Sequence, residues 1–165
     1  MPIPQGLNFL MRQEVDAMFT MKWRPIAQRN NITPNLAGNY MIAFSESDLT
    51  GQVVQPEDVT YVGESKQRDG VRKRIDLFVK AAEDGKTPHS GGKTLRRLYY
   101  SDMPLSKCNT NRKLYFVVCT FPCNVDKATR TPADLLVIGK VCLLELELMA
   151  YIKHYTGCEP ACNSR

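Results

Sequence analysis

Two glutamates stand inside an apolar stretch of the chain, residues 141–149, where Glu145 and Glu147 alternate with leucines. Burying an unpaired carboxylate is costly, so a carboxylate in such a stretch needs a compensating partner. A metal ion is one such partner, and an arginine is the other. The stretch has helical periodicity, and two positions along a helix differ in direction by about 200°. The two carboxylates therefore cannot point the same way, and we take Glu145 as the candidate metal ligand and place Glu147 on the outer face.

Two tyrosines precede these glutamates in short motifs. Tyr40 stands at the start of a strand-like segment as Gly-Asn-Tyr, and Tyr61 stands at the end of another as Tyr-Val-Gly. Each motif alone is a weak signal, because a tyrosine in a strand is usually part of a half-buried sheet surface. The two motifs gain weight because a helix with Arg72 and Arg74, and then the carboxylates, come after them along the chain.

Basic residues gather in two places on a chain whose net charge is +5. The first group comes after Tyr61 and the second after a glycine-rich segment; the candidate nucleic-acid-binding residues among them are Lys66, Arg68, Lys73, Arg96 and Arg97. Such clusters can neutralise phosphates and give salt-dependent binding to nucleic acid. The alternative is a solvated helix face with no ligand, and the sequence alone leaves both open.

The hydrophobic pattern predicts the elements that must position these residues. Strands are expected at 38–44, 59–63 and 113–121, with the last as the central strand. Helices are expected at 7–22, 70–83, 94–100 and from Pro132 to a cap at Gly157, and Gly139 divides the last into two. The polar segment after Trp23 and the segment 84–93 are expected to be loops, the second of them flexible. The fold class is therefore α+β, a small three-stranded mixed or antiparallel sheet flanked by helices.

Five motifs in order resemble the GIY-YIG nuclease superfamily: GNY (38–40), YVG (61–63), RKRI (72–75), LLELELM (143–149) and PACN (160–163). The resemblance covers residues 36–163, which implies one nuclease domain at 36–165 with an N-terminal helical extension at 1–35. Three spacings depart from the family. Tyr40 and Tyr61 stand further apart than usual, the arginine is displaced by a few residues, and Asn163 stands further from Glu145.

The resemblance implies a mechanism for hydrolysing a phosphodiester bond. Glu145 would hold one Mg²⁺ (or Mn²⁺) that stabilises the leaving group, and Tyr40 would activate the water as general base with Tyr61 positioning it. A free tyrosine has a pKa of about 10, so the neighbouring arginine and the metal must lower it. Arg74, succeeded by an isoleucine as in the family, is the first choice for the arginine that clamps the phosphate, and Arg72 is the second.

Three further residues enter through the same resemblance. Asn163 corresponds to the family's closing asparagine, which buttresses the site. His89 and Lys93 lie in a segment similar to one in stand-alone restriction enzymes and in a bacteriophage endonuclease (endonuclease II), where an inserted histidine or lysine reaches the scissile phosphate. A solvated loop without that role is the equal alternative for both residues.

The expected function is stand-alone cleavage of DNA by a restriction-like or phage-type endonuclease, because the chain has no room for an appended DNA-binding domain. A duplex break needs two active sites, so a homodimer or homotetramer is expected, formed through the N-terminal helix. One alternative is a non-catalytic nucleic-acid-binding or inhibitor protein on the same fold. Another is a zinc-stabilised module built on the C-x3-C pairs Cys119/Cys123 and Cys158/Cys162.

Composition narrows the class of protein. No apolar run approaches the roughly 20 residues that span a bilayer, and the N-terminal segment lacks the features of a signal peptide. We therefore expect no membrane partner and an intracellular, cytoplasmic protein of a bacterial or phage-infected cell. In that compartment the six cysteines are expected to be reduced thiols.

Overall fold

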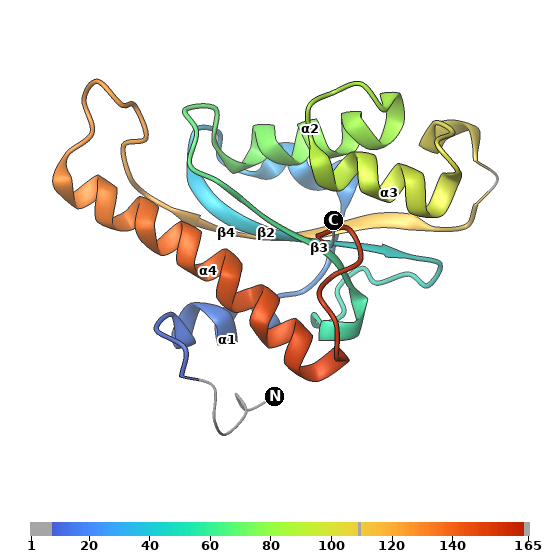
Figure 1. Ribbon diagram of the computed structural model, residues 1–165, viewed down its shortest axis with the longest axis horizontal. Helices are drawn as coiled ribbons and strands as arrows, with labels where there is room; N and C mark the ends of the chain where they lie inside the picture. Colours follow the sequence, from blue (N-terminus) through green and yellow to red (C-terminus); the bar gives the residue numbers. More distant parts are fainter. Residues whose placement is uncertain (1–7, 109, 164–165) are drawn as a thin grey trace.

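Four strands form one antiparallel sheet in the order β1-β4-β2-β3 in the computed structural model, which describes residues 8–108 and 110–163 (Figure 1). The strands are β1 (Arg24–Pro25), β2 (Ala37–Ser45), β3 (Val59–Ser65) and β4 (Lys113–Phe121). The α+β class is confirmed, whereas the expectation of three strands is wrong. The additional strand, β1, has only two residues paired with β4, too few for any alternation to be visible in the sequence.

Helices cover both faces of this sheet. The helices α2 (Gly70–Asp84) and α3 (Ser90–Tyr100) lie on one face, and α1 (Arg12–Thr20) and α4 (Pro132–Thr156) lie on the other (Figure 1). Short 3-10 helices occupy Ile26–Asn31, Pro56–Asp58 and Leu105–Lys107. Because side chains alternate along a strand, Tyr40 and Ile42 of β2 pack under α2, and Met41 and Ala43 pack with α1 and α4. Strand β2 is consequently buried over nearly its whole length.

The last helix, α4, is a single helix of 25 residues, so the expected division at Gly139 is wrong. Its ends are as predicted. Thr131 and Asp134 form a capping box with Pro132 in the first turn, and Gly157 closes the helix with a positive φ of 81°. One glycine costs a helix only about 1 kcal/mol, which the packing of α4 against the sheet outweighs.

The segment 84–93 is not a flexible loop, because α3 already begins at Ser90 and both of its glycines are buried. A Cβ at Gly92 would collide with the carbonyl oxygen of Phe78 in α2, and a Cβ at Gly91 would lie 2.5 Å from the ring of Tyr61. The glycines therefore permit close packing rather than mobility. Composition alone favours a loop, since glycine is common in both situations.

Glu147 does not lie on the outer face, as expected from the sequence, but is buried. Its carboxylate accepts hydrogen bonds from the backbone N–H groups of Leu10 (2.7 Å) and Met11 (2.9 Å) at the start of α1. The N-terminal N–H groups of a helix lack partners within the helix and attract negative charge. The second glutamate of the apolar stretch thus attaches α1 to α4.

The first helix is shorter than the predicted 7–22. It covers Arg12–Thr20, and Leu7 lies outside the described residues. Leu10, inside the predicted range, precedes the helix and is 78% exposed. Among the described helices, none combines the length and apolar character that crossing a bilayer demands.

Candidate active site

The two tyrosines meet on the face of the sheet that α2 and α3 cover. Tyr40 of β2 and Tyr61 of β3 lie on neighbouring strands, with ring centroids 5.9 Å apart. Gly63 pairs with Tyr40 across the strands, and a Cβ there would lie 2.7 Å from the Tyr40 hydroxyl and from the Tyr61 ring. Because the last residue of the Tyr-Val-Gly motif has no side chain, the two phenol rings can lie close to each other.

His89 joins the tyrosines from the N-terminus of α3. Its Nε2 lies 2.9 Å from the hydroxyl oxygen of Tyr40, and its Nδ1 accepts a hydrogen bond from the backbone N–H of Gly92 at 3.4 Å. Burial, and then the positive charge of Arg74, lower the pKa of His89 to about 3, so the ring is neutral near pH 7. Since Nδ1 accepts, the single ring proton is on Nε2 and is donated to Tyr40.

The phenols extend this chain of hydrogen bonds. The interaction between the two hydroxyls raises the pKa of Tyr40 and lowers that of Tyr61. Burial is nevertheless the largest effect, and it raises the pKa of both tyrosines above 10. Without a bound metal, the protein therefore does not lower the pKa of either tyrosine below its ordinary value, as the sequence-based mechanism requires.

Arg74 is the arginine that faces this group. Its charge acts on Tyr40, Tyr61, His89 and Glu145. Arg72, two positions earlier on α2, points elsewhere and donates from its guanidinium to the Asn30 side chain at 3.3 Å. The structure thus brings Arg74, and not Arg72, to the tyrosines.

Glu145 reaches the site from α4. Burial, and then the negative charge of Glu64, raise its pKa from 4.5 to about 7, while Lys66 and Arg74 act in the opposite direction. Glu64 stands directly after the Tyr-Val-Gly motif, and its Oε1 lies 3.4 Å from the Nζ of Lys66. Its Oε2 is buried without a hydrogen-bond partner among the described residues. Sequence reasoning did not select Glu64, although its position next to the motif was a usable signal.

Asn163 holds the strand that carries Tyr61. Its side chain accepts from the backbone N–H of Val62 and donates to the Val62 carbonyl, both at 2.7 Å. The backbone N–H of Cys162 adds a bond to the carbonyl of Thr60 at 2.9 Å. Strand β3 is at the edge of the sheet, so this C-terminal segment replaces a missing neighbouring strand. Asn163 therefore positions Tyr61 and does not itself meet the other site groups.

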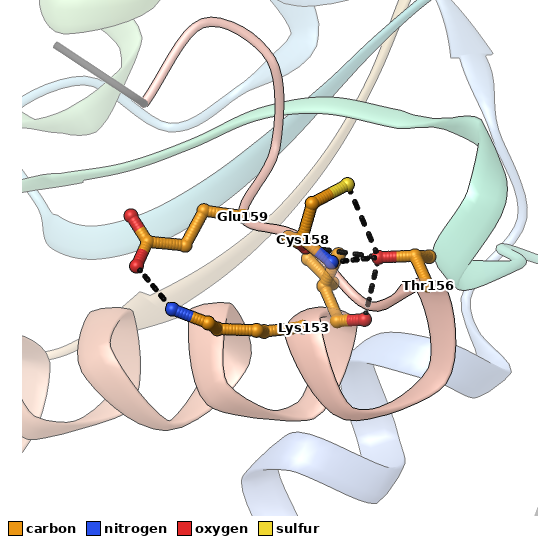
Figure 2. A network of polar contacts seen from close by, with 5 residues as sticks. Lys153, Thr156, Cys158 and Glu159 are labelled. Carbon is orange, nitrogen blue, oxygen red and sulfur yellow. Dashed lines mark hydrogen bonds and ion pairs between the residues drawn. The ribbon is translucent and has the colours of Figure 1, made fainter.

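A turn after α4 directs the chain toward this contact (Figure 2). The hydroxyl of Thr156 lies 2.9 Å from the carbonyl oxygens of both Ile152 and Cys158, and the ammonium of Lys153 lies 3.1 Å from the carboxylate of Glu159. The ion pair is exposed and contributes little stability, but the Thr156 contacts fix the direction in which the chain leaves the helix.

The second basic group lies apart from the tyrosines. Lys93, Arg96 and Arg97 line a separate hollow of about 180 Å³ with Gly85. The guanidinium of Arg96 already donates to the carbonyls of Glu83 and Asp102, so it is committed to holding α2 and α3 together. Lys93 is exposed on α3.

Within residues 8–108 and 110–163, no group of three or more His, Cys, Asp or Glu side chains is arranged to hold a metal ion. The six cysteines are free thiols. The geometry therefore offers no four-cysteine zinc site, and the candidate cation ligands are the two carboxylates Glu145 and Glu64.

Comparisons of this chain with protein-family models, with curated proteins and with solved structures find no match.

Proposed function

We propose that this chain is a metal-dependent endonuclease of the GIY-YIG type that hydrolyses phosphodiester bonds in DNA. One observation carries the proposal: the rings of two tyrosines lie 5.9 Å apart, and an arginine and a half-buried carboxylate from two further elements are near enough for their charges to shift the pKa of both phenols. These are the four groups that the ordered motifs single out. Stability does not require such a set, because buried polar groups without full pairing are costly.

The carboxylates fit a divalent cation. A carboxyl whose pKa is raised to about 7 by burial and by a second carboxylate is stabilised in its charged form by a cation. The buried, unpartnered Oε2 of Glu64 is a second oxygen donor beside it among the described residues. Glu145, with Glu64, would hold Mg²⁺ or Mn²⁺, both of which take oxygen ligands. When bound, the ion supplies charge stabilisation to the leaving oxygen.

Arg74 is the proposed phosphate clamp. Its charge acts on both tyrosines and on Glu145, so a phosphodiester bound by Arg74 would lie near all three groups. A guanidinium offers paired donors in a plane, which match two phosphoryl oxygens. The clamp neutralises charge that develops on the phosphoryl group during attack.

The roles that we assign to the two tyrosines differ from the expectation that Tyr40 is the general base. Tyr40 is fully buried and its pKa is raised well above 10, which is opposite to what a base requires. Tyr61 retains 6% exposure. Burial and then the charge of Glu145 raise its pKa, but Arg74 and the interaction with Tyr40 act in the opposite direction. We assign Tyr61 to the attacking water, and Tyr40 with His89 to orienting Tyr61.

A non-catalytic nucleic-acid-binding protein is the second candidate. The observation that favours it is the raised pKa of both tyrosines, because neither phenol is poised to accept a proton in the protein alone. Binding without cleavage in the presence of Mg²⁺ would support it.

The test is incubation of purified protein with plasmid and phage DNA of varied sequence, in MgCl₂, in MnCl₂ and in EDTA. The proposal predicts nicks or breaks that require the metal and that Glu145→Gln abolishes. Intact DNA in every condition, or equal cutting by the variant, contradicts it. A homodimer or homotetramer is part of the same proposal, since a double-strand break needs two sites, and sizing the active protein by light scattering tests it.

A further inference from the structure

A cleft of about 600 Å³ adjoins the candidate site on the side of Lys66. One wall is the segment 66–68 between β3 and α2, and the other is the segment 125–130 before α4, with Ile138 also in the lining. A second hollow of about 470 Å³ shares Arg68, Val125 and Asp126 with it and extends to Asn35. Because they share these residues, the two hollows adjoin and form one depression.

The cleft is basic on both walls. Lys66 and Arg68 stand on one wall, and Lys127 and Arg130 stand on the other. Of these, Lys66 also acts on Glu145, so the cleft and the candidate site share a side chain. Neither Lys127 nor Arg130 has an ion pair within the described part of the chain.

Two acidic residues also line the hollows, Asp126 in both and Asp69 in the second, and the turn itself uses Asp126. The carboxylate of Asp126 accepts from the backbone N–H of Ala128 at 3.0 Å, and its carbonyl accepts from the N–H of Arg130 at 2.9 Å. Asn124 adds a side-chain bond to Thr129 at 2.9 Å. The turn is thus fixed by its own hydrogen bonds, and Lys127 projects from an ordered backbone at an exposed position.

We infer that this cleft binds the sugar-phosphate backbone of duplex DNA beside the scissile bond, with Lys127 and Arg130 as phosphate contacts. The inference rests on the proposed function and states where the DNA substrate lies on the protein. Four cations on two walls of an extended depression suit a row of phosphates, whereas a single small anion would need one closed pocket. Sequence reasoning did not select Lys127 or Arg130, because they stand apart from the basic clusters.

The test compares Lys127→Ala/Arg130→Ala with a matched control, Lys80→Ala/Lys86→Ala, which removes the same charge from exposed positions in the last turns of α2 and just after it. Affinity for a fluorescent DNA duplex is measured in EDTA between about 50 and 200 mM salt. We expect the cleft variant to bind at least about tenfold more weakly. The slope of log K against log salt should fall by about 1.8, which is 0.9 for each lost phosphate contact. The control should match the parent in both.

The outcomes separate the cleft from the nuclease activity. If the parent cuts DNA but the cleft variant binds DNA with unchanged affinity and salt slope, the proposed binding at the cleft is wrong and the proposed function is unaffected. A parent that binds DNA through Lys127 and Arg130 but never cuts it supports the cleft and contradicts the proposed function. Tighter binding of RNA than of DNA, lost in the cleft variant, overturns the assignment to DNA, as does absence of binding by the parent. Thermal unfolding of each variant verifies that it is folded.

Discussion

Replacing Glu145 with glutamine should stabilise the metal-free protein at neutral pH. In the folded protein the pKa of Glu145 is raised from 4.5 to about 7 by burial and by Glu64. The folded state therefore binds the proton more tightly than the unfolded state. The stability associated with this group is fully present below pH 4.5 and is lost as pH rises through about 7. Glutamine carries no charge at any pH, so the variant should not show this loss.

The size of the effect is set by the shift in pKa. A change from 4.5 to about 7, at about 1.36 kcal/mol for each pH unit, sets an upper bound of about 3 kcal/mol. The carboxylate is only half-buried, and solvent screening reduces this figure. We expect the variant to exceed the parent by about 1 kcal/mol at pH 8 and to equal it at pH 4.

The assay is urea unfolding of both proteins in EDTA across that pH range, with Glu147→Gln as the matched control on the same helix. Because Glu147 accepts two backbone N–H bonds at the start of α1, its replacement should destabilise the protein by about 1 kcal/mol at pH 8.

Adding MgCl₂ at pH 8 should then raise the stability of the parent and leave Glu145→Gln unchanged, because only a ligand that binds the folded state shifts the equilibrium. A Glu145→Gln variant that is less stable than the parent at pH 8 in EDTA would refute this account of the carboxylate.

Three further changes probe the other parts of the site. Gly63→Ala places a Cβ 2.7 Å from Tyr40 and Tyr61, and should cost about 1–3 kcal/mol in urea unfolding together with most of the cleavage rate; unchanged stability would contradict the close approach. His89→Gln should slow cleavage without altering its pH dependence between pH 5 and 8, because the pKa of His89 is about 3; loss of a limb near pH 6 in a rate profile would show that the histidine titrates there. Asn163→Ala removes two hydrogen bonds to the backbone of Val62 in β3 and should cost about 1–3 kcal/mol, with faster amide exchange at Val62; unchanged exchange would refute its positioning role.

The elements that the sequence predicts well are those with long, regular patterns. The helix at 70–83 and the strand at 113–121 match α2 and β4 closely, because each has enough residues for its period to show. Strand β1 has two residues and shows no period. Gly91 and Gly92 lead to the wrong prediction of a flexible loop. Glycine is required at these positions by contacts with α2 and Tyr61, which exist only in the folded structure.

The sequence predicts which residues the candidate site brings together better than it predicts how each of them is placed. Motif order selects the tyrosines, an arginine and Glu145, but the choice between Arg72 and Arg74 depends on which side of α2 faces the sheet. The function of Glu147 depends on a partner 136 positions away in the chain, and no local pattern encodes such a contact. The depth of burial that raises the pKa of Tyr40 is likewise a property of the assembled core.

The central claim is tested most directly by the rate at which three proteins nick supercoiled plasmid in MgCl₂: the parent, Arg74→Ala and Arg72→Ala. The two variants remove the same side chain two positions apart on α2, but only Arg74 acts on the tyrosines and Glu145. We predict metal-dependent nicking by the parent, a loss of at least about a hundredfold for Arg74→Ala, and a rate near that of the parent for Arg72→Ala. No nicking by the parent, or equal rates for the two variants, would contradict the account.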